Sequence, residues 1–342
     1  MRSLAAIAVL ALGCGGGGSG TDSDANGGDD GGGGGDDGGG TVDAAPCAPG
    51  TIDVGTGCVP IDPGDPAQRT QAEVCMKWAT EHVVTDAQPF SRATTGDCDS
   101  GTLSAGGHAD TLKRINLFRW LVGVGPTTLN TGLDSQQQQC ANLESWWNFS
   151  LPDSPHAPPN TVKCYTASGA AGAGSSNIAW GNGPAASIDQ FQQDNGNATT
   201  MGHRRWIVNP PLSGVGVGYW EGGGMYGKAM CMSVFGNAGT GPNPPFVAVP
   251  NQGFVPVQMT AWTWTFHSAK GGTANAMIAM TRVSDGMSLA VTRMVLSQGY
   301  GQPAISWKPM GWTPVAGESY RVTVSGLTGG DVTYIVKPVT CT

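Results

Sequence analysis

Eight cysteines follow position 14 in this chain of 342 residues, and they constrain its fold more than any other feature. An even number of cysteines predicts disulfide bonds if the chain leaves the reducing cytoplasm, and no Cys-x-x-Cys spacing suggests a zinc or redox site. The sequence does not fix which cysteines pair. We expect bonds between neighbours in the sequence, which gives the pairs Cys47–Cys58, Cys75–Cys98, Cys140–Cys164 and Cys231–Cys341.

Residues 1–14 predict that the chain is exported. Met1-Arg2 gives a basic start, and residues 4–12 form the apolar run LAAIAVLAL. A basic start before a short apolar core is typical of a secretory signal and is too short for a spanning helix. The run ends at Ala11-Leu12-Gly13-Cys14, which resembles a bacterial lipobox and implies a lipoprotein signal with Cys14 as the lipidated residue. An ordinary signal with an incidental cysteine is the alternative.

Residues 15–46 are rich in glycine and contain the pairs Asp29-Asp30 and Asp36-Asp37. They carry too few apolar side chains for a core, so we expect a disordered tether that links the folded part to a membrane through the lipid anchor only. Residues 1–43 contain seven acidic residues and one basic residue, whereas the rest of the chain is almost balanced. A nearly neutral folded part lacks the basic face that a nucleic-acid partner requires.

Between residues 47 and 240 the sequence predicts helices around a small sheet. A lead-in at 47–107 holds the first four of the eight cysteines and one helix near 68–83. Apolar periodicity predicts further helices at 110–122, 133–149 and 185–194, and strands at 215–219 and 225–234. This mixture favours an α+β fold.

After residue 241 the pattern changes to strands alone. A Pro-rich stretch, GPNPPFVAVP, leads into alternating apolar residues such as Trp262, Trp264 and Phe266. The tripeptide Ser284-Asp285-Gly286 is a turn signal between two apolar runs. About six or seven strands at this spacing predict an immunoglobulin-like or fibronectin-like β-sandwich over residues 241–342.

Residues 108–240 also carry several motifs in a fixed order. The motifs are Asn116-Leu117-Phe118-Arg119 with Gly123-Val124-Gly125-Pro126, a helix from Leu133 to Trp147, Pro155-His156, Ser175-Ser176-Asn177-Ile178-Ala179, Gly202-His203-Arg204-Arg205-Trp206 and Val215-Gly216-Val217-Gly218-Tyr219. This series resembles the CAP domain, also called the SCP or sperm-coating-protein domain, of the bacterial extracellular type. The resemblance covers little over a third of the chain. It implies a three-layer α-β-α sandwich with a cleft.

In that family the cleft holds two histidines and usually two acidic residues, and some members bind a divalent metal, often zinc, at the histidine pair. His156 and His203 stand at the histidine positions of this chain. Ser176, beside Asn177, stands where the family has its first glutamate. With two good nitrogen ligands, zinc is expected to bind weakly, and Ser176→Glu is expected to tighten it.

Other residues of these motifs have open interpretations. Asp189 and Asp194 are candidates for the second acid by position alone. Structural alternatives stand beside the functional ones, since His203 could hydrogen-bond inside the cleft and position Trp206. Arg204-Arg205 could receive an acidic ligand or form structural ion pairs.

Three classes of function stay open on the sequence. The first is an exported, lipid-anchored module that binds an extracellular lipid, peptide or envelope component in the cleft. The second is a metal-assisted hydrolase, and the third is a structural or adhesive envelope protein. The sequence contains no Gly-x-Ser-x-Gly elbow, and oxidised cysteines are not nucleophiles, so Ser176 at an acid position favours the first and third classes. The expected location is the outer membrane, the cell surface or the extracellular space.

Overall fold

The computed structural model describes residues 47–54, 57–148, 153–235 and 242–341. The predicted signal, Cys14 and the predicted tether lie outside the described residues. The described residues contain seven α-helices and eighteen strands, which confirms the predicted α+β class. The helices are α1 (Gln71–Glu81), α2 (Ala105–Leu121), α3 (Asp134–Trp146), α4 (Ala167–Gly174), α5 (Pro184–Gln193), α6 (Gly202–Ile207) and α7 (Val257–Thr260).

Capping side chains set the starts of the first two helices. Thr70 accepts a hydrogen bond from the backbone N–H of Glu73, and the Glu73 carboxylate accepts one from the backbone N–H of Thr70. This capping box starts α1 inside the predicted range. The Ser104 hydroxyl accepts from the backbone N–H of Gly107, so α2 starts earlier than the predicted residue 110.

A three-stranded antiparallel sheet lies at the centre of the first part of the fold. Its order is β6-β9-β8, with β6 at Ser176–Trp180, β8 at Val217–Glu221 and β9 at Lys228–Ser233. Strands β8 and β9 confirm the predicted strands at 215–219 and 225–234, whereas β6 was not predicted.

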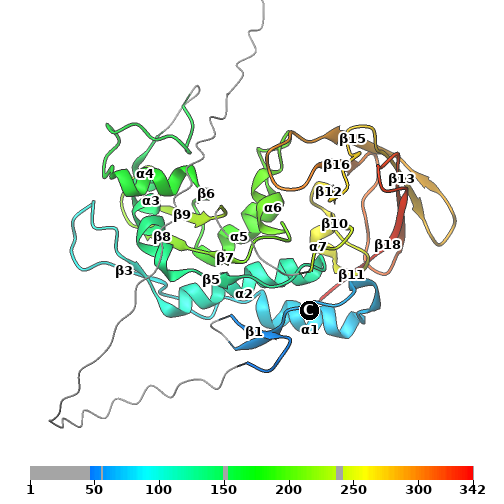
Figure 1. Cartoon of the computed structure of the whole chain (residues 1–342), viewed down its shortest axis with the longest axis horizontal. Coiled ribbons are helices and arrows are strands. Elements are labelled where there is room, and N and C mark those ends of the chain that lie inside the picture. The colour runs from blue at the N-terminus through cyan, green and yellow to red at the C-terminus, as the bar shows by residue number, and fades with distance from the viewer. Residues whose placement is uncertain (1–46, 55–56, 149–152, 236–241, 342) are drawn as a thin grey trace, which may run out of the picture. The chain divides into compact units, whose positions relative to one another are not determined.

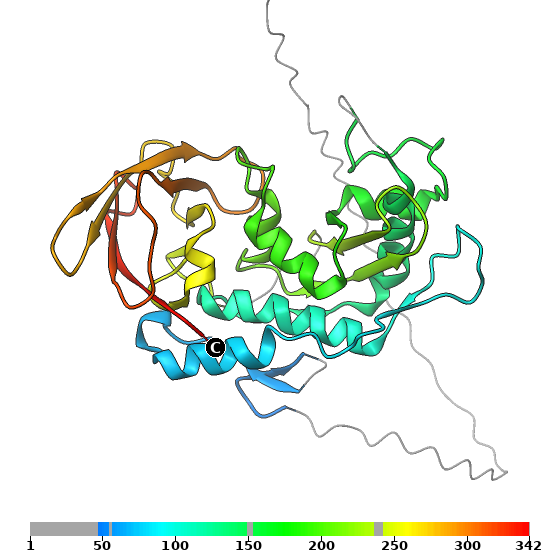
Figure 2. The ribbon, with the colours of Figure 1, turned by 180° about the vertical axis from the view of Figure 1, so that it is seen from behind.

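The two faces of this sheet pack against different helices because side chains alternate along each strand. One face contributes Ile178, Trp220 and Cys231 to a core with residues of α3 and α4. The other face packs against α2 and α5 through a larger set, Ala179, Val217, Tyr219, Met230 and Met232. The sheet therefore has helices on both sides (Figure 1). In the reverse view α1, α2 and α5 lie one above another, from the blue helix at the lower edge to the green helix above (Figure 2).

Glycine permits the closest of these contacts. A Cβ built on Gly218 of β8 would lie 2.1 Å from the backbone carbonyl carbon of Gln137 in α3. A larger residue at this position would force α3 away from the sheet.

The second part of the fold consists of two sheets that share one core. The first has the order β10-β12-β16-β15, with bounds Phe246–Val249, Trp264–Ser268, Ala304–Pro309 and Val291–Val295. The second has the order β11-β18-β17-β13-β14, with bounds Gly253–Pro256, Val332–Val339, Tyr320–Ser325, Met277–Arg282 and Ser288–Leu289. Trp264, Phe266 and Trp307 of the first sheet are buried against Met280, Val322 and Val336 of the second.

Three further sheets have two strands each. They are β1 (Thr51–Asp53) with β2 (Cys58–Pro60), β3 (Phe90–Ser91) with β4 (Thr102–Leu103), and β5 (Thr128–Leu129) with β7 (Gly214–Val215).

The two parts are joined by a common core and by backbone contacts. Val247, Val249 and Met259 belong to the same buried cluster as α2 and α5. The Asn251 side-chain amide donates to the backbone carbonyl of Val122 at 2.6 Å. The described residues 47–341 accordingly form one compact unit.

Four disulfides confirm the predicted oxidation of all eight cysteines, but only Cys47–Cys58 has the predicted partners. The other three predicted pairings are wrong, because the bonds are Cys75–Cys341, Cys98–Cys164 and Cys140–Cys231. Cys140 of α3 faces Cys231 across the layer between helix and sheet. Cys341 follows β18, which pairs with β11, and β11 packs on α1, so the chain end lies beside Cys75 (Figure 1).

Four disulfides are typical of a protein that folds in an oxidising environment outside the cytoplasm. Among the described residues, none of the helices combines the length and apolar character needed to span a bilayer.

Candidate functional site

His203 is held by a buried carboxylate. It lies on α6, and its Nδ1 is 2.9 Å from Oδ1 of Asp194, whose side chain is 0% exposed. Asp194 also accepts hydrogen bonds from the Asn197 side-chain amide at 2.8 Å and from the backbone N–H of Arg204 at 3.3 Å. Because a carboxylate only accepts, the contact with Asp194 requires a proton on Nδ1 of His203, and the side-chain nitrogen of Asn197 also lies 3.0 Å from this atom. In the neutral ring with this tautomer, Nε2 is an acceptor.

The backbone around this pair is unusual. Asp194 ends α5 with φ 53°, and Met201 precedes α6 with φ 45°. Left-handed conformations of residues other than glycine carry a cost, which the surrounding contacts must offset. They turn the chain between the two helices so that Asp194 meets His203.

His203 is also fixed by its neighbours. The Asn177 side-chain amide of β6 donates to the backbone carbonyl of His203 at 2.9 Å. The ring packs on Phe191 with centroids 5.1 Å apart, and the side chain is 23% exposed. The predicted residues Asn177 and His203 are thus in direct contact.

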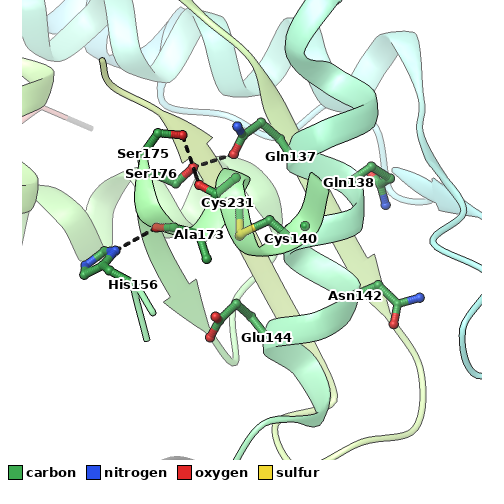
Figure 3. The surroundings of a disulfide bond; sticks show 12 residues. Gln137, Gln138, Cys140, Asn142, Glu144, His156, Ala173, Ser175, Ser176 and Cys231 are labelled. Atoms are coloured by element: carbon green, nitrogen blue, oxygen red, sulfur yellow. Dashed lines mark hydrogen bonds between the residues drawn. A yellow bond between two sulfur atoms is a disulfide. The ribbon is translucent and has the colours of Figure 1, made fainter. Parts of the chain in front are cut away.

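His156 is anchored in a similar way by a backbone carbonyl. Its Nδ1 donates to the carbonyl oxygen of Ala173 at 2.8 Å, so its Nε2 is also an acceptor (Figure 3). The residue lies at the surface, but the loss of solvent around the ring lowers its pKa, and the hydrogen bond to Ala173 opposes this shift.

The Nε2 atoms of the two rings share one property. Among the residues that the structure describes, none forms a hydrogen bond with Nε2 of His156 or of His203. A metal-binding histidine usually donates its other ring N–H to a carboxylate or a backbone carbonyl, as both of these do. The described part of the chain contains no cluster of three or more histidine, cysteine or acidic residues suited to a metal.

Ser176 does not direct its hydroxyl toward this pair. The side chain is buried, and its Oγ lies 2.7 Å from the carbonyl oxygen of Gly172 and within hydrogen-bond distance of the Gln137 side chain (Figure 3). Neighbouring residues of a strand point to opposite faces, so Ser176 faces α3 while Asn177 faces His203.

Of the two candidates for the second acid, Asp189 and Asp194, only one contacts His203. Asp194 meets His203, whereas Asp189 forms ion pairs with Arg114 and with His82. Asp194 is thus the acid beside the histidine. Asn197 was not predicted, although its position three residues after Asp194 allows it to cap that carboxylate.

Arg204 and Arg205 are structural residues. Both are buried, and their guanidinium groups donate to backbone carbonyls rather than to acidic side chains. Arg204 reaches Gln192 and Thr263, and Arg205 reaches Ser297 and Gln302. They fasten α6, and with it His203, to the C-terminal sheets.

Glu144 is a buried carboxyl that the sequence analysis missed. It is 0% exposed, and burial raises its pKa to about 8. Its two oxygens have no hydrogen-bond partner among the described residues. Figure 3 places it on the face of α3 that also carries Gln137 and Cys140. Gln137, Cys140 and Glu144 occupy positions i, i+3 and i+7, which lie on one face of a helix. Because one of them is a disulfide cysteine, this spacing could have predicted that Glu144 is buried.

Comparison with known proteins adds no relative. The chain matches no protein-family model, and it matches no curated protein.

Proposed function

We propose that this chain is an exported, lipid-anchored protein of the CAP type that binds an extracellular ligand at His156 and His203. The observation that carries the proposal is the matched anchoring of the two rings. Each Nδ1–H is donated to a fixed oxygen, Asp194 Oδ1 or Ala173 O, and each Nε2 is left for a ligand.

The chemistry of the site suits recognition of hydrogen-bond donors. In their neutral forms the two imidazoles offer two lone pairs, so a ligand with hydroxyl, amine or amide N–H groups that reaches both rings would satisfy both. Lipid headgroups, peptides and envelope glycans all carry such groups. The ligand class is proposed from this donor requirement.

Zinc is a useful probe of the same lone pairs. Both rings have the oxygen partner on Nδ1 that metal-bound histidines have, but the described residues supply only these two nitrogens to one ion. A closed zinc site uses four ligands, so we expect a dissociation constant of about 1 µM or weaker.

The contacts of the serines support binding over covalent catalysis. The Ser176 hydroxyl is buried against Gly172 and Gln137, and the Ser175 hydroxyl lies 3.1 Å from the carbonyl oxygen of Ala171. Neither is bonded to an imidazole, and a serine nucleophile needs such a base. The disulfide-bonded cysteines are unavailable as thiolates.

One observation favours a second candidate, a water-activating hydrolase. The Asp194–His203 pair has the arrangement that orients a general base. This alternative predicts that the protein, supplied with zinc, cleaves fluorescently labelled casein and that His203→Ala abolishes the cleavage. Binding without cleavage is the outcome that the main proposal requires.

The main proposal is tested by zinc titration calorimetry on the disulfide-intact protein. The variants are His156→Ala, His203→Ala and the double variant, with His82→Ala as a control because His82 pairs with Asp189 away from the two rings. Each single change should weaken zinc binding at least about tenfold, whereas the control variant should leave the affinity unchanged. An unaltered affinity in the double variant would refute the site.

The location outside the cytoplasm is proposed from the sequence and supported by the four disulfides. Attachment through Cys14 is tested by labelling cells with radioactive palmitate. The native chain should take up label and Cys14→Ser should not, and equal labelling of both would contradict the anchor.

A further inference from the structure

A pocket lies between the N-terminal hairpin and helices α1 and α2. It has a volume of about 150 Å³ and is open to solvent. The hairpin β1–β2, closed by the Cys47–Cys58 disulfide, forms one wall, and residues of α1, α2 and the loop after α2 form the others. None of the histidine-site residues lines it.

The walls of this pocket are mainly apolar. Seven of its twelve lining residues are valine, proline or tryptophan, and they include Val54, Val59, Trp120 and Val124. An apolar cavity of about this volume holds one benzene-sized ring. The size and lining therefore suit a single aromatic ring or a short alkyl chain.

Trp120 is held in place as part of the wall. The Arg69 guanidinium carbon lies 3.7 Å from the centroid of its ring, and Arg69 also donates to the backbone carbonyls of Trp120 and Pro63. The pocket is thus built before a ligand arrives, which lowers the cost of binding.

Two of the four charged groups that line the pocket form an ion pair with each other. Lys77 forms an ion pair with Glu81 at 2.5 Å, and Asp62, at the exposed rim, accepts from the backbone N–H of Gly64 at 2.9 Å. The half-buried Lys113 lines the same pocket, and no described residue forms an ion pair or hydrogen bond with its ammonium group. Lys113 is on the same face of α2 as Trp120, two helical turns away.

We propose that this pocket is a binding site for a small organic anion, with the apolar ring or chain against Trp120 and the valines and the anionic group on Lys113. A half-buried cation without a partner in a mainly apolar pocket sets this ligand class. The proposal is independent of the histidine site, because the two sites share no lining residue.

The test uses 3-phenylpropionate as the anionic probe and 3-phenylpropan-1-ol as its neutral counterpart, in calorimetry on the disulfide-intact protein. We expect 3-phenylpropionate to bind with a dissociation constant of about 1 mM or lower. The alcohol should bind about three- to fivefold more weakly, the contribution of one half-exposed ion pair. No detectable binding of 3-phenylpropionate at about 10 mM, tenfold above the expected dissociation constant, would overturn the proposal. Equal affinities of the two probes would overturn it as well.

Three variants locate the probe. Lys113→Gln should weaken 3-phenylpropionate about three- to fivefold and abolish the preference over the alcohol, whereas Lys113→Arg should retain it. Val59→Trp fills the pocket from the half-buried hairpin and should abolish binding. In the native protein the indole N–H signal of Trp120, assigned with Trp120→Phe, should shift during the titration. An unshifted Trp120 signal, or full affinity in Val59→Trp, would place the probe elsewhere and refute the site.

Discussion

Oδ1 of Asp194 lies 2.9 Å from Nδ1 of His203, although the two residues are nine positions apart, with Asp194 just after α5 and His203 in α6. The carboxylate is completely buried, and it is held by Asn197 and by the backbone of Arg204. It therefore fixes both the orientation of the imidazole and the nitrogen that carries the proton.

Asp194→Asn should weaken zinc binding about 10- to 100-fold, the range found when the hydrogen-bond partner of a metal-bound histidine is lost. The asparagine amide can present N–H toward Nδ1 and so favour the wrong tautomer. Calorimetry gives the affinity, and thermal unfolding shows whether the fold is kept. Asp189→Asn is the matched control, since Asp189 contacts His82 and Arg114 instead. Equal losses in both variants would contradict a specific role for Asp194.

Glu144 should make the protein less stable as the pH rises from about 4.5 to about 8. Its pKa is raised to about 8 in the folded protein by burial, from an ordinary value of 4.5. The unfolded chain therefore releases this proton at a lower pH than the folded protein, and deprotonation favours unfolding throughout the interval. A shift of this size corresponds to roughly 4 to 5 kcal/mol.

Glu144→Gln removes this ionisation, so its free energy of unfolding should vary less with pH and should exceed that of the native protein at pH 8. Urea unfolding at pH 5, 6, 7 and 8 measures the difference. Glu221→Gln, at a side chain 43% exposed, is the control and should leave the pH profile unchanged. A Glu144→Gln profile parallel to the native one would contradict the prediction.

The Cys75–Cys341 bond should contribute more stability than the Cys47–Cys58 bond. The first closes a sequence separation of 266 residues and the second one of 11. Loop-closure entropy of the unfolded chain gives about 6 kcal/mol for the long loop and about 3 kcal/mol for the short one. Urea unfolding of the two double Cys→Ser variants compares them directly. A larger loss from the Cys47–Cys58 variant would contradict the entropic ranking.

Ser176→Glu should destabilise the protein by about 3 kcal/mol or more, because it places a carboxylate in a buried position beside Gln137 and the carbonyl of Gly172. This expectation reverses the one drawn from the sequence, in which the new acid would tighten zinc. Ser176→Ala serves as the milder comparison and should cost about 1 kcal/mol. Chemical unfolding and a zinc titration of each variant decide between the two expectations, and tighter zinc binding by a stable Ser176→Glu protein would restore the first.

The helices that the sequence predicted contain large apolar side chains at helical spacing. Helices α1 and α5 bury one apolar face, whereas α2 is buried on most sides and α3 buries polar residues beside apolar ones. Helix α4 has the sequence ASGAAGAG, which has no apolar period. It packs closely on α3, where a Cβ on Gly172 would lie 2.9 Å from the carbonyl oxygen of Gln136. A helix that depends on such a contact cannot be found from its own residues.

Long-range pairings were the least predictable feature. The stretch 241–250 has the composition of a linker, yet its second half is β10, which pairs with β12. Three disulfides join residues that are 66 to 266 positions apart. Neighbouring pairs minimise loop closure in the unfolded chain, but the packing of α3 on the sheet and of β11 on α1 selects other partners.

The sequence predicted which residues form the candidate site better than it predicted where their side chains point. His156, His203 and Asn177 were named from motifs and Asp194 by position alone, and the structure brings Asn177 and Asp194 to His203. The direction of Ser176 follows from the alternation of β6, a strand that was not predicted. The motif alone therefore placed Ser176 at the position of the family's glutamate, whereas in the structure its hydroxyl faces α3.

The central claim is that His156 and His203 present their Nε2 atoms to one ligand, and long-range ¹H–¹⁵N NMR of the imidazole rings during a zinc titration tests it most directly. Before zinc is added, both rings should show the tautomer protonated on Nδ1, as the contacts with Ala173 and Asp194 require. On addition of zinc, the two Nε2 signals should shift together with one stoichiometric ion. Protonation on Nε2 in either ring, or a shift of one ring without the other, would contradict the account.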